Sequence, residues 1–383
     1  MKKLLNFHDY RQAAKRKLPR FLFEYIDRGS EDEHAICNLH NSFSNIRLTP
    51  KILQGIDNPD LSTQYFNKNY NIPLIIAPTA LAGIVAVDGE VKLARSAGKL
   101  GIPFTVSTQS VTTIEDIRQN AAETELWFQL YMWRNRKLTQ TLLERVWNAG
   151  VSTLVVTVDT PISPKREYNQ KNGFSIPFRL SLRSILDVLG APHWLFFVLL
   201  QLYKRNGMPS YGHYPEEFRH NIMSVSQNED LRIEDKLNWS DVEVLRTTWK
   251  GQIILKGILS PDDAQKALAL GMDGIVVSAH GGRNFDSAVT PIDVLEPIID
   301  KMGEKIAIFA DSGVRRGSDI AKLLSFGVKA VLLGRAPLWG LAGQDEKGSM
   351  IILQLLIEEL QQTMIMLGCK NIEDLPMSRN AQK

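Results

Sequence analysis

The sequence predicts a (β/α)8 barrel with an N-terminal helical cap and one long insertion after the fourth strand. Three observations indicate this fold: eight short apolar runs, helical segments between most of them, and polar residues at the end of every run. The runs are rich in Val, Ile, Leu or Phe without strict alternation, which is typical of strands buried on both faces. They span residues 72–78, 103–108, 125–130, 153–158, 252–256, 273–278, 305–310 and 329–333.

Amphipathic helical segments fill most intervals between the runs, at residues 90–100, 113–120, 138–149, 262–270, 291–302 and 318–326. Gly101, Gly150, Gly271 and Gly327 follow four of them, where a left-handed C-cap favours glycine. An open doubly wound sheet is the competing fold. However, no G-x-G-x-x-G follows the first run, and the Gly-rich turns come only in the sixth to eighth units. We therefore expect the barrel.

The chain divides into three parts on this prediction. Residues 1–70 contain helix-like segments at 9–17 and 20–28 and form a helical cap. Residues 71–375 form the barrel, within which 165–250 is an insertion and active-site loop region, because more than ninety residues replace a connection of about thirty. Residues 376–383 form a C-terminal tail.

Composition excludes several classes of protein. The 383 residues are 44% apolar and 23% charged, so the chain can bury a substantial core. Lys and Arg number 45 against 42 Asp and Glu, which argues against a nucleic-acid partner. Cys37 and Cys369 alone cannot form a disulfide scaffold or a cysteine metal cluster, and no metal site is expected. Without a signal peptide or an apolar run of about 18 residues, we expect a cytoplasmic protein, either soluble or peripheral on the inner face of the cytoplasmic membrane.

The insertion contains an unusually apolar segment at residues 193–203, preceded by Arg183 and followed by Lys204 and Arg205. About ten apolar residues are too few to span a bilayer. One interpretation is an interfacial patch within residues 180–215 that dips into a membrane or contacts a partner. The other is a helix packed on the barrel or on another subunit. The sequence leaves both open, although the flanking cations favour the membrane.

Polar residues at the end of each predicted strand indicate a ligand site at the barrel mouth. A purely structural barrel would not need a charged or hydrogen-bonding group at each end. The residues are Thr79, Ser107, Thr108, Gln129, Tyr131, Thr157, Asp159, Lys256, Ser278, His280, Asp311, Gly334 and Arg335.

The last two units contain an expected phosphate site. The sequence from Asp311 to Gly317 reads D-S-G-V-R-R-G and opens the seventh helix, and Gly334-Arg335 opens the eighth. Glycines let backbone amides approach an anion, helix N-termini add partial positive charge, and arginine supplies paired hydrogen bonds. The alternative is tight turns with solvated arginines.

The segment from Ser278 to Asp286 reads S-A-H-G-G-R-N-F-D. His280 at a strand end is suited to act as a general base, and Arg283 beside it is suited to bind a carboxylate. Asp159 can orient the imidazole. Arg166 is either a second carboxylate clamp or part of a solvated loop. Lys256 is either a Schiff-base nucleophile or a fixed positive charge beside an electron-rich cofactor, with a snorkelling lysine as the structural alternative.

Five stretches resemble the FMN-dependent 2-hydroxy-acid dehydrogenases and oxidases. They are P-T-A-L-A-G at 78–83, Q-L-Y at 129–131, T-V-D-T-P at 157–161, L-K-G at 255–257, and the His280 segment together with D-S-G-V-R-R-G and L-G-R. The resemblance runs from about residue 9 to residue 375 in the family's order. The insertion resembles that of the membrane-associated mandelate dehydrogenases most closely.

The resemblance implies FMN-dependent oxidation of an L-2-hydroxy acid, mandelate-like or lactate-like, to the 2-oxo acid. Electrons would pass to quinone or another acceptor, and the chain would form a homotetramer. His280 is then the base and Asp159 its partner, while Arg283, Arg166, Tyr25 and Tyr131 hold the substrate. The residues around the flavin ring are Pro78, Thr79, Ala80, Ser107, Gln129 and Thr157, with Lys256 at its N1/O2 edge. Ser278, Asp311, Ser312, Gly313, Arg315, Gly334 and Arg335 would bind the ribityl chain and the phosphate.

Three departures from the family pattern bear on this assignment. Ala279 stands where the family usually has Asn, Asn284-Phe285 replaces Gln-Leu, and Gln109 occupies a position that is aromatic in some oxidases. Three other functions therefore stay open: an oxygen-using oxidase of the same family, a non-redox phosphate-binding barrel that uses Lys256 as a Schiff-base lysine, and a non-catalytic flavoprotein or membrane scaffold.

Overall fold

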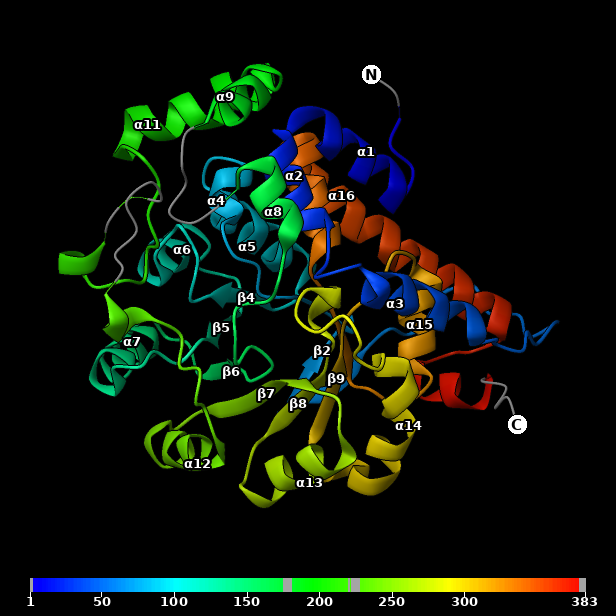
Figure 1. Ribbon diagram of the computed structural model, residues 1–383. Coiled ribbons are helices and arrows are strands. Elements are labelled where there is room, and N and C mark those ends of the chain that lie inside the picture. The colour runs from blue at the N-terminus through cyan, green and yellow to red at the C-terminus, as the bar shows by residue number, and fades with distance from the viewer. Residues whose placement is uncertain (1–2, 175–180, 220, 222–227, 379–383) are drawn as a thin grey trace.

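A closed barrel of eight parallel strands forms the centre of the computed structural model (Figure 1). The structure describes residues 3–174, 181–219, 221 and 228–378. Residues 1–2 of the expected cap, 175–180, 220 and 222–227 of the expected insertion, and 379–383 of the expected tail lie outside the described residues. Residue 180, the first of the expected membrane segment, is among them.

The barrel confirms the predicted fold class and all eight predicted strands. Each strand pairs with its neighbours in sequence order, and β10 closes the ring by pairing with β3 through Val331 and Leu74. Nearly every strand residue is buried, as runs without alternation require. The strands are β3 (Leu74–Ile76), β4 (Phe104–Ser107), β5 (Leu126–Leu130), β6 (Thr153–Thr157), β7 (Gln252–Ile258), β8 (Gly274–Val277), β9 (Ala307–Ala310) and β10 (Ala330–Leu333).

Helices surround the strands, and the six predicted between them are present. Gly101, Gly150, Gly271 and Gly327 all have positive φ, as expected for left-handed helix ends. These helices are α5 (Gly89–Leu100), α6 (Ile114–Asn120), α7 (Arg136–Asn148), α13 (Pro261–Ala269), α14 (Pro291–Met302) and α15 (Gly317–Leu324). Helix α12 (Trp239–Thr248) was not predicted. The length of α16 (Arg335–Leu367) was not predicted either, and its helical backbone conformation is interrupted at Gln344 and Asp345.

The N-terminal segment forms α1 (Phe7–Lys17), α2 (Arg20–Asp27) and α3 (His34–Asn45), followed by a hairpin of β1 (Thr63–Tyr65) and β2 (Lys68–Tyr70). The first two helices match the two predicted segments, whereas α3 and the hairpin were not predicted. The hairpin lies at the N-terminal end of the barrel, where the Tyr65 ring meets Trp127 and Phe309 in edge-to-face contacts. It fills that end with aromatic side chains and leaves the opposite end for the site.

The region after β6 contains α8 (Glu167–Asn172), α9 (Leu182–Leu189), α10 (Pro192–Trp194), the π-helical turn η1 (Leu195–Leu199) and α11 (Leu200–Asn206). In Figure 1, α9 and α11 project from the upper left of the molecule, beyond α4 (Ala82–Val85) and α8. Phe196 and Phe197 are each 59% exposed, while Trp194 and Val198 are buried. One face of the apolar segment therefore packs on the protein, and the other is open.

The end of the insertion folds back onto the barrel. His213 Nδ1 lies 3.2 Å from the Thr108 carbonyl, and the Gly212 amide donates to the Ser110 carbonyl over 2.9 Å. Burial lowers the pKa of His213 to about 4, so its imidazole is neutral. Residues around 209–214 thus pack directly on the barrel, at the loop after β4, unlike the projecting helices before them.

One helix of the described chain is long and apolar enough to cross a membrane by length and composition, and a bent pair of helices would also qualify if it were one span. The helix is α16, which packs against α1, α5 and α15 and carries Arg335 and Leu338 to the barrel mouth. The pair consists of α9 and residues 192–205 and is bent by 87°. The first behaves as a core helix. The second has the exposed apolar face described above.

The short helices that remain are η2 (Glu216–Phe218), η3 (Glu229–Leu231), η4 (His280–Gly282), η5 (Gly303–Lys305) and η6 (Ile372–Ser378).

Candidate active site

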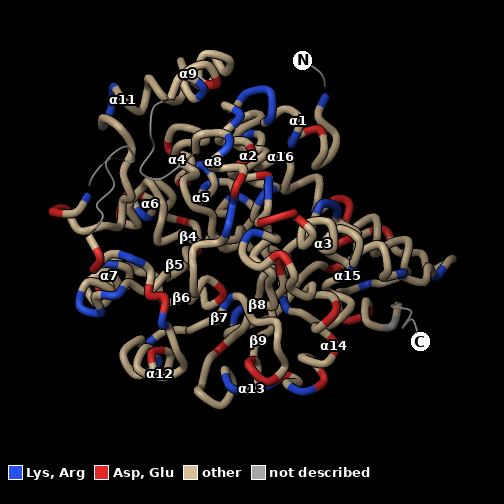
Figure 2. The backbone as a smooth tube through the Cα atoms, viewed as in Figure 1, with Lys and Arg blue, Asp and Glu red and all other residues tan. Residues whose placement is uncertain are grey.

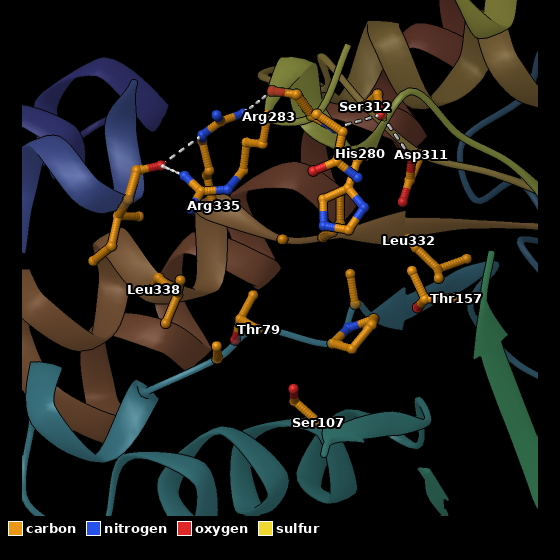
Figure 3. Close-up of a pocket in the computed structure, with 18 of the residues that line it drawn as sticks. Thr79, Ser107, Thr157, His280, Arg283, Asp311, Ser312, Leu332, Arg335 and Leu338 are labelled. Carbon is orange, nitrogen blue, oxygen red and sulfur yellow. Dashed lines mark hydrogen bonds between the residues drawn. The ribbon is translucent and has the colours of Figure 1, made fainter. Parts of the chain in front are cut away.

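A cavity of about 360 Å³ opens at the carboxyl ends of the barrel strands and extends under α1, α2 and α3. Its size falls within the usual range for small-molecule sites. Nearly all of the predicted site residues line it, and ten residues of its wall are labelled in Figure 3. The exceptions are Asp159 and Ser278, which lie behind His280 and Lys256, and Thr108, whose hydroxyl bonds the backbone of Gln129 and Tyr131.

His280 points into the cavity (Figure 3) and is held from behind by Asp159. The imidazole Nδ1 lies 3.0 Å from one carboxylate oxygen and 3.1 Å from the other. This contact assigns the proton to Nδ1 and leaves Nε2 free to accept one. Gly257 makes the approach possible, because a Cβ on that residue would lie 2.5 Å from the Asp159 side chain.

Two opposing effects set the charge of this pair. Burial lowers the pKa of His280, Asp159 raises it, and the positive charge of Lys256 lowers it again, with a net decrease. Burial opposes ionisation of Asp159, but the charge of His280, the hydrogen bond to it and the charge of Lys256 keep the pKa of that carboxyl below its ordinary value. At neutral pH the site therefore holds a carboxylate beside a neutral imidazole, which is the form that a general base requires.

A sharp turn presents the imidazole. His280, Gly281 and Gly282 all have positive φ, at 52°, 63° and 72°. A Cβ on Gly281 would lie 2.9 Å from the Arg335 guanidinium, and one on Gly282 would lie 2.8 Å from Ile36 of α3. The two glycines are therefore required by close approach as well as by backbone conformation.

Ser312 stabilises the same turn from β9. Its hydroxyl oxygen accepts from the amides of Ala279, at 3.2 Å, and Gly281, at 2.9 Å, and donates to Asp311. Ala279 stands at the position where the family pattern has an amide side chain. The Ser312 hydroxyl gives the turn its hydrogen bonds without one.

Lys256 contributes a fixed positive charge to the cavity wall. The Nζ atom donates to Ser278 Oγ over 2.9 Å and lies 3.1 Å from Asp311 Oδ2. The Lys256 side chain is only 5% exposed. Ser278 Oγ also accepts from the His280 amide, so this hydroxyl orients both residues from behind the cavity wall.

Arg283 and Arg166 lie together at one side of the cavity. The Arg283 guanidinium lies 4.9 Å from the centre of the Tyr25 ring and donates to the Tyr25 carbonyl. Arg166 donates to the Arg283 carbonyl over 3.0 Å. Burial and the charge of Arg283 lower the pKa of Arg166 to about 10, so the Arg166 guanidinium remains cationic at neutral pH. Within the described residues, both guanidiniums donate to backbone carbonyls, which leaves their charge available to an anion.

Tyr131 lies at the same side of the cavity. Burial and the nearby Asp159 carboxylate raise the pKa of the Tyr131 phenol, so it remains protonated and can donate a hydrogen bond.

A chain of hydrogen-bonded polar side chains crosses the neighbouring strands β4, β5 and β6. Ser107 Oγ donates to Gln129 Oε1 over 3.2 Å, and Gln129 Nε2 donates to Thr157 Oγ1 over 3.0 Å.

The cavity carries further positive charge beside Arg283, since Arg283 and Arg335 both donate to the Ile26 carbonyl, at 3.3 Å and 2.9 Å. Arg315 and Arg335 were predicted at the phosphate site. Burial lowers the pKa of Arg335 to about 10, and this guanidinium donates to the carbonyls of Ile26 and Gly281. Arg11 of α1 also lines the cavity and forms a two-pronged ion pair with Asp27, with Nε 2.6 Å from Oδ1.

The charges around Arg335 suit a phosphate monoester. The guanidiniums of Arg11, Arg315 and Arg335 outnumber the Asp27 carboxylate, so the net charge of this group is positive. Asp319 lies outside the cavity wall and accepts the backbone amides of Arg315 and Arg316. A phosphate monoester carries a charge of about −1.5 to −2 at neutral pH. Gly313 and Gly334 line the same cavity.

Sequence reasoning missed the residues that reach the cavity from the cap and from the apolar positions of the barrel. Neither an amphipathic helix nor a strand interior carries a local signal that one of its side chains faces a ligand. These lining residues are Phe7, Arg11, Ile26, Asp27, Ile36, Leu39, Ala77, Thr160, Ser163, Pro164, Ile233, Val314, Leu332, Leu333, Ala336 and Leu338.

Comparisons with known proteins agree with this geometry. The family model described as FMN-dependent dehydrogenase matches residues 14–381. The chain belongs to this family. An L-lactate dehydrogenase of Stenotrophomonas maltophilia is 40% identical over 369 residues, which are 96% of each chain. The (S)-mandelate dehydrogenase of Pseudomonas putida is 36% identical over 373 residues, 97% of this chain and 92% of that protein.

Solved structures agree as well. The crystal structure of the monotopic membrane protein (S)-mandelate dehydrogenase has a TM-score of 0.93 and 35% identity, and the match covers 100% of both chains. A mandelate oxidase variant with (S)-mandelic acid has a TM-score of 0.81 and 27% identity, covering 99% of both chains. The chain is thus an FMN-dependent oxidoreductase, and the Schiff-base alternative for Lys256 is set aside.

The residues of the cavity fit FMN. The guanidiniums of Arg11, Arg315 and Arg335 suit the phosphate, the neutral hydrogen-bonding groups of Ser107, Gln129 and Thr157 suit the ring, and Lys256 adds one cation. When bound, FMN accepts two electrons from a substrate.

Proposed function

We propose that this protein oxidises an L-2-hydroxy acid, lactate-like or mandelate-like, to the 2-oxo acid. The observation that carries the proposal is the pair of His280 and Asp159, whose imidazole lines the same cavity as the guanidiniums of Arg166 and Arg283. Relatives named L-lactate dehydrogenase and (S)-mandelate dehydrogenase support the same substrate class.

The proposed roles of the substrate-binding residues follow from their positions. Arg283 and Arg166 bind the carboxylate, which fixes the 2-hydroxyl near His280 Nε2. Tyr25 and Tyr131 donate hydrogen bonds to the carboxylate or the hydroxyl. His280 takes a proton from the substrate, and Asp159 stabilises the imidazolium that results.

The proposed roles around the cofactor place the ring beside Pro78–Ala80, Ser107, Gln129 and Thr157, with Lys256 at its N1/O2 edge. The ribityl chain and the phosphate extend towards Asp311, Ser312, Gly313, Arg315, Gly334 and Arg335. Arg11 joins this second group, because it lines the same cavity. Ser278 orients Lys256 instead of meeting the ribityl chain, since its hydroxyl faces Lys256 and the His280 amide.

We propose that electrons pass to quinone and that the protein is peripheral on the inner face of the cytoplasmic membrane. The exposed apolar face of α9–α11 supports this location. The stretch from Pro192 to Tyr203 contains no Lys, Arg, Asp or Glu and lies between Arg183 and Asp187 on one side and Lys204 and Arg205 on the other. Figure 2 shows that the tube around α9 and α11 is mostly free of these charged residues. The match to a structure described as a monotopic membrane protein supports it further. We also propose the expected division of the chain into a cap (1–70), a barrel (71–375) with its insertion (165–250), and a tail (376–383). We further propose that the protein forms a homotetramer.

The decisive experiment uses the purified holoprotein. We expect a yellow protein whose flavin absorbance is bleached anaerobically by L-lactate or (S)-mandelate and is restored by a quinone analogue. Bleaching by neither acid, nor by other members of a 2-hydroxy-acid panel, contradicts the proposed substrate class. Reoxidation by oxygen at a rate comparable to that with quinone favours the oxidase alternative.

A further inference from the structure

Trp194 lies at the junction between the projecting helices and the barrel mouth. It ends α10 and is 6% exposed, although the next two turns carry the exposed rings of Phe196 and Phe197. The indole Nε1 donates to the Ile84 carbonyl over 2.7 Å. Ile84 belongs to α4, the helix directly after Pro78–Ala80 of the cavity wall. The insertion is therefore attached through this indole to the helix that follows the cavity-lining residues Pro78–Ala80.

A continuous column of aromatic rings leads from Trp194 to Tyr25 in the cavity wall. The Trp194 ring meets Phe21 edge to face, with ring centres 6.2 Å apart. Phe21 is stacked on Phe174 at 5.9 Å, and Phe174 contacts Tyr25 at 4.5 Å. Trp194, Phe21 and Phe174 are all buried. We refer to Trp194, Phe21, Phe174 and Tyr25 as the aromatic column.

The column connects α2, whose Tyr25 ring contacts Arg283, with the residue that follows α8, the helix that begins after Arg166. Phe21 and Tyr25 are four residues apart on α2 and so lie on one face of that helix. Phe174 follows α8, which begins directly after Arg166. Asn172 at the end of α8 donates to Glu24 of α2 over 2.9 Å. Because Arg283 lies over the Tyr25 ring, a shift of α2 would alter the position of the whole clamp.

We propose that Trp194 is a positioning residue for the substrate, which acts through the aromatic column on Tyr25 and the carboxylate clamp. Seating of α9–α11 on the barrel then sets the affinity for the 2-hydroxy acid. The proposal rests on the proposed function, because it uses the substrate-binding role of Tyr25. Packed interiors transmit displacements of this kind since they have few voids to absorb them.

The test compares Trp194→Ala and Trp194→Phe in the detergent-solubilised holoprotein with a soluble dye as electron acceptor. A misplacement of the clamp weakens binding of the acid, so we expect KM to rise about tenfold for Trp194→Ala, with kcat within about twofold of the parent. Trp194→Phe keeps a ring against Phe21 and should stay within about twofold in both constants. Flavin content should not change. The dissociation constant of a carboxylic acid that lacks the 2-hydroxyl, followed by the flavin spectrum, should rise as KM does.

Phe197→Ala is the matched control, since Phe197 belongs to the same segment but is 59% exposed. We expect it to weaken binding to vesicles without a change in KM. Phe21→Leu provides a second break in the column, should Trp194→Ala fail to fold, and predicts the same rise in KM.

A double-mutant cycle separates positioning from a general structural effect. Tyr25→Phe removes only the hydroxyl, and its effect on KM should be at least threefold smaller in the Trp194→Ala background than in the parent. Additive effects, or an unchanged KM in both Trp194→Ala and Phe21→Leu, overturn the inference. A parent protein that no 2-hydroxy acid reduces would instead overturn the proposed function.

Discussion

The barrel mouth and the projecting helices α9–α11 differ in the side chains that they bury and expose. At the mouth, charged side chains are buried and held by neighbours, as with Lys256 between Ser278 and Asp311. On α9–α11, large apolar side chains such as Phe196 and Phe197 stay exposed. Burying charged side chains and exposing large apolar ones are both energetically unfavourable unless a binding partner compensates. The comparison teaches that each region is shaped for a partner, an anionic cofactor and substrate in one case and an apolar phase in the other.

The largest effect is expected when the base is removed, which tests whether the catalytic reaction depends on the barrel mouth alone. In His280→Ala, substrate reduction of the flavin should fall by about 10²- to 10⁴-fold, because no general base remains. Stopped-flow absorbance measures the rate. Flavin content and vesicle binding should match the parent, and a parental reduction rate would remove His280 from the assigned role.

The converse change tests whether membrane binding belongs to α9–α11 alone. The double change Phe196→Ser and Phe197→Ser removes roughly 3–6 kcal/mol of apolar transfer free energy, so partitioning into lipid vesicles should fall about 100-fold or more. Co-sedimentation with vesicles measures it.

Val244→Ser on α12 is the control for that experiment, because this exposed apolar residue lies away from α9–α11 (Figure 1). Equal loss in both proteins would contradict a localised patch. Deletion of the segment should be confined to residues 182–205, since residues 209–214 pack directly on the barrel.

A smaller effect is expected at the proposed phosphate site. Arg11→Ala should weaken FMN binding about tenfold, because a guanidinium near a phosphate is lost. Binding of riboflavin, which lacks the phosphate, should change little. Flavin fluorescence titration of the apoprotein measures both.

Arg20→Ala removes a more exposed ion pair, that with Glu24 of α2, and serves as the control for Arg11. Equal weakening of FMN and riboflavin binding in Arg11→Ala would point to a structural defect and not to a phosphate contact.

The smallest expected effect concerns pH. The base must be neutral, so kcat/KM should be lost as pH falls through the pKa of His280 and should be level above it. Burial places this pKa below its ordinary value of about 6.5. Asp159→Asn removes the group that raises the pKa, so the midpoint should move further down while the plateau falls. A midpoint above pH 7 in the parent would contradict the neutral resting imidazole.

The predictable part of the site came from residues whose partners are close in sequence or fixed by the barrel's symmetry. The His280–Gly281–Gly282 turn and the D-S-G-V-R-R-G segment could be identified because strand ends meet at one mouth whatever the rest of the fold does. Arg11 could not be identified, because α1 reads as an ordinary amphipathic helix and its ion pair with Asp27 forms between two helices. The same holds for the hairpin that closes the far end of the barrel.

The sequence by itself determined the eight strands, the chemistry at their ends and the presence of an apolar segment, since these depend on local residue patterns. Tertiary structure alone decided which face of that segment is open, which cap residues reach the cavity, and that rings from three separate segments of the chain form one column. Those features depend on distances between elements that no local pattern encodes.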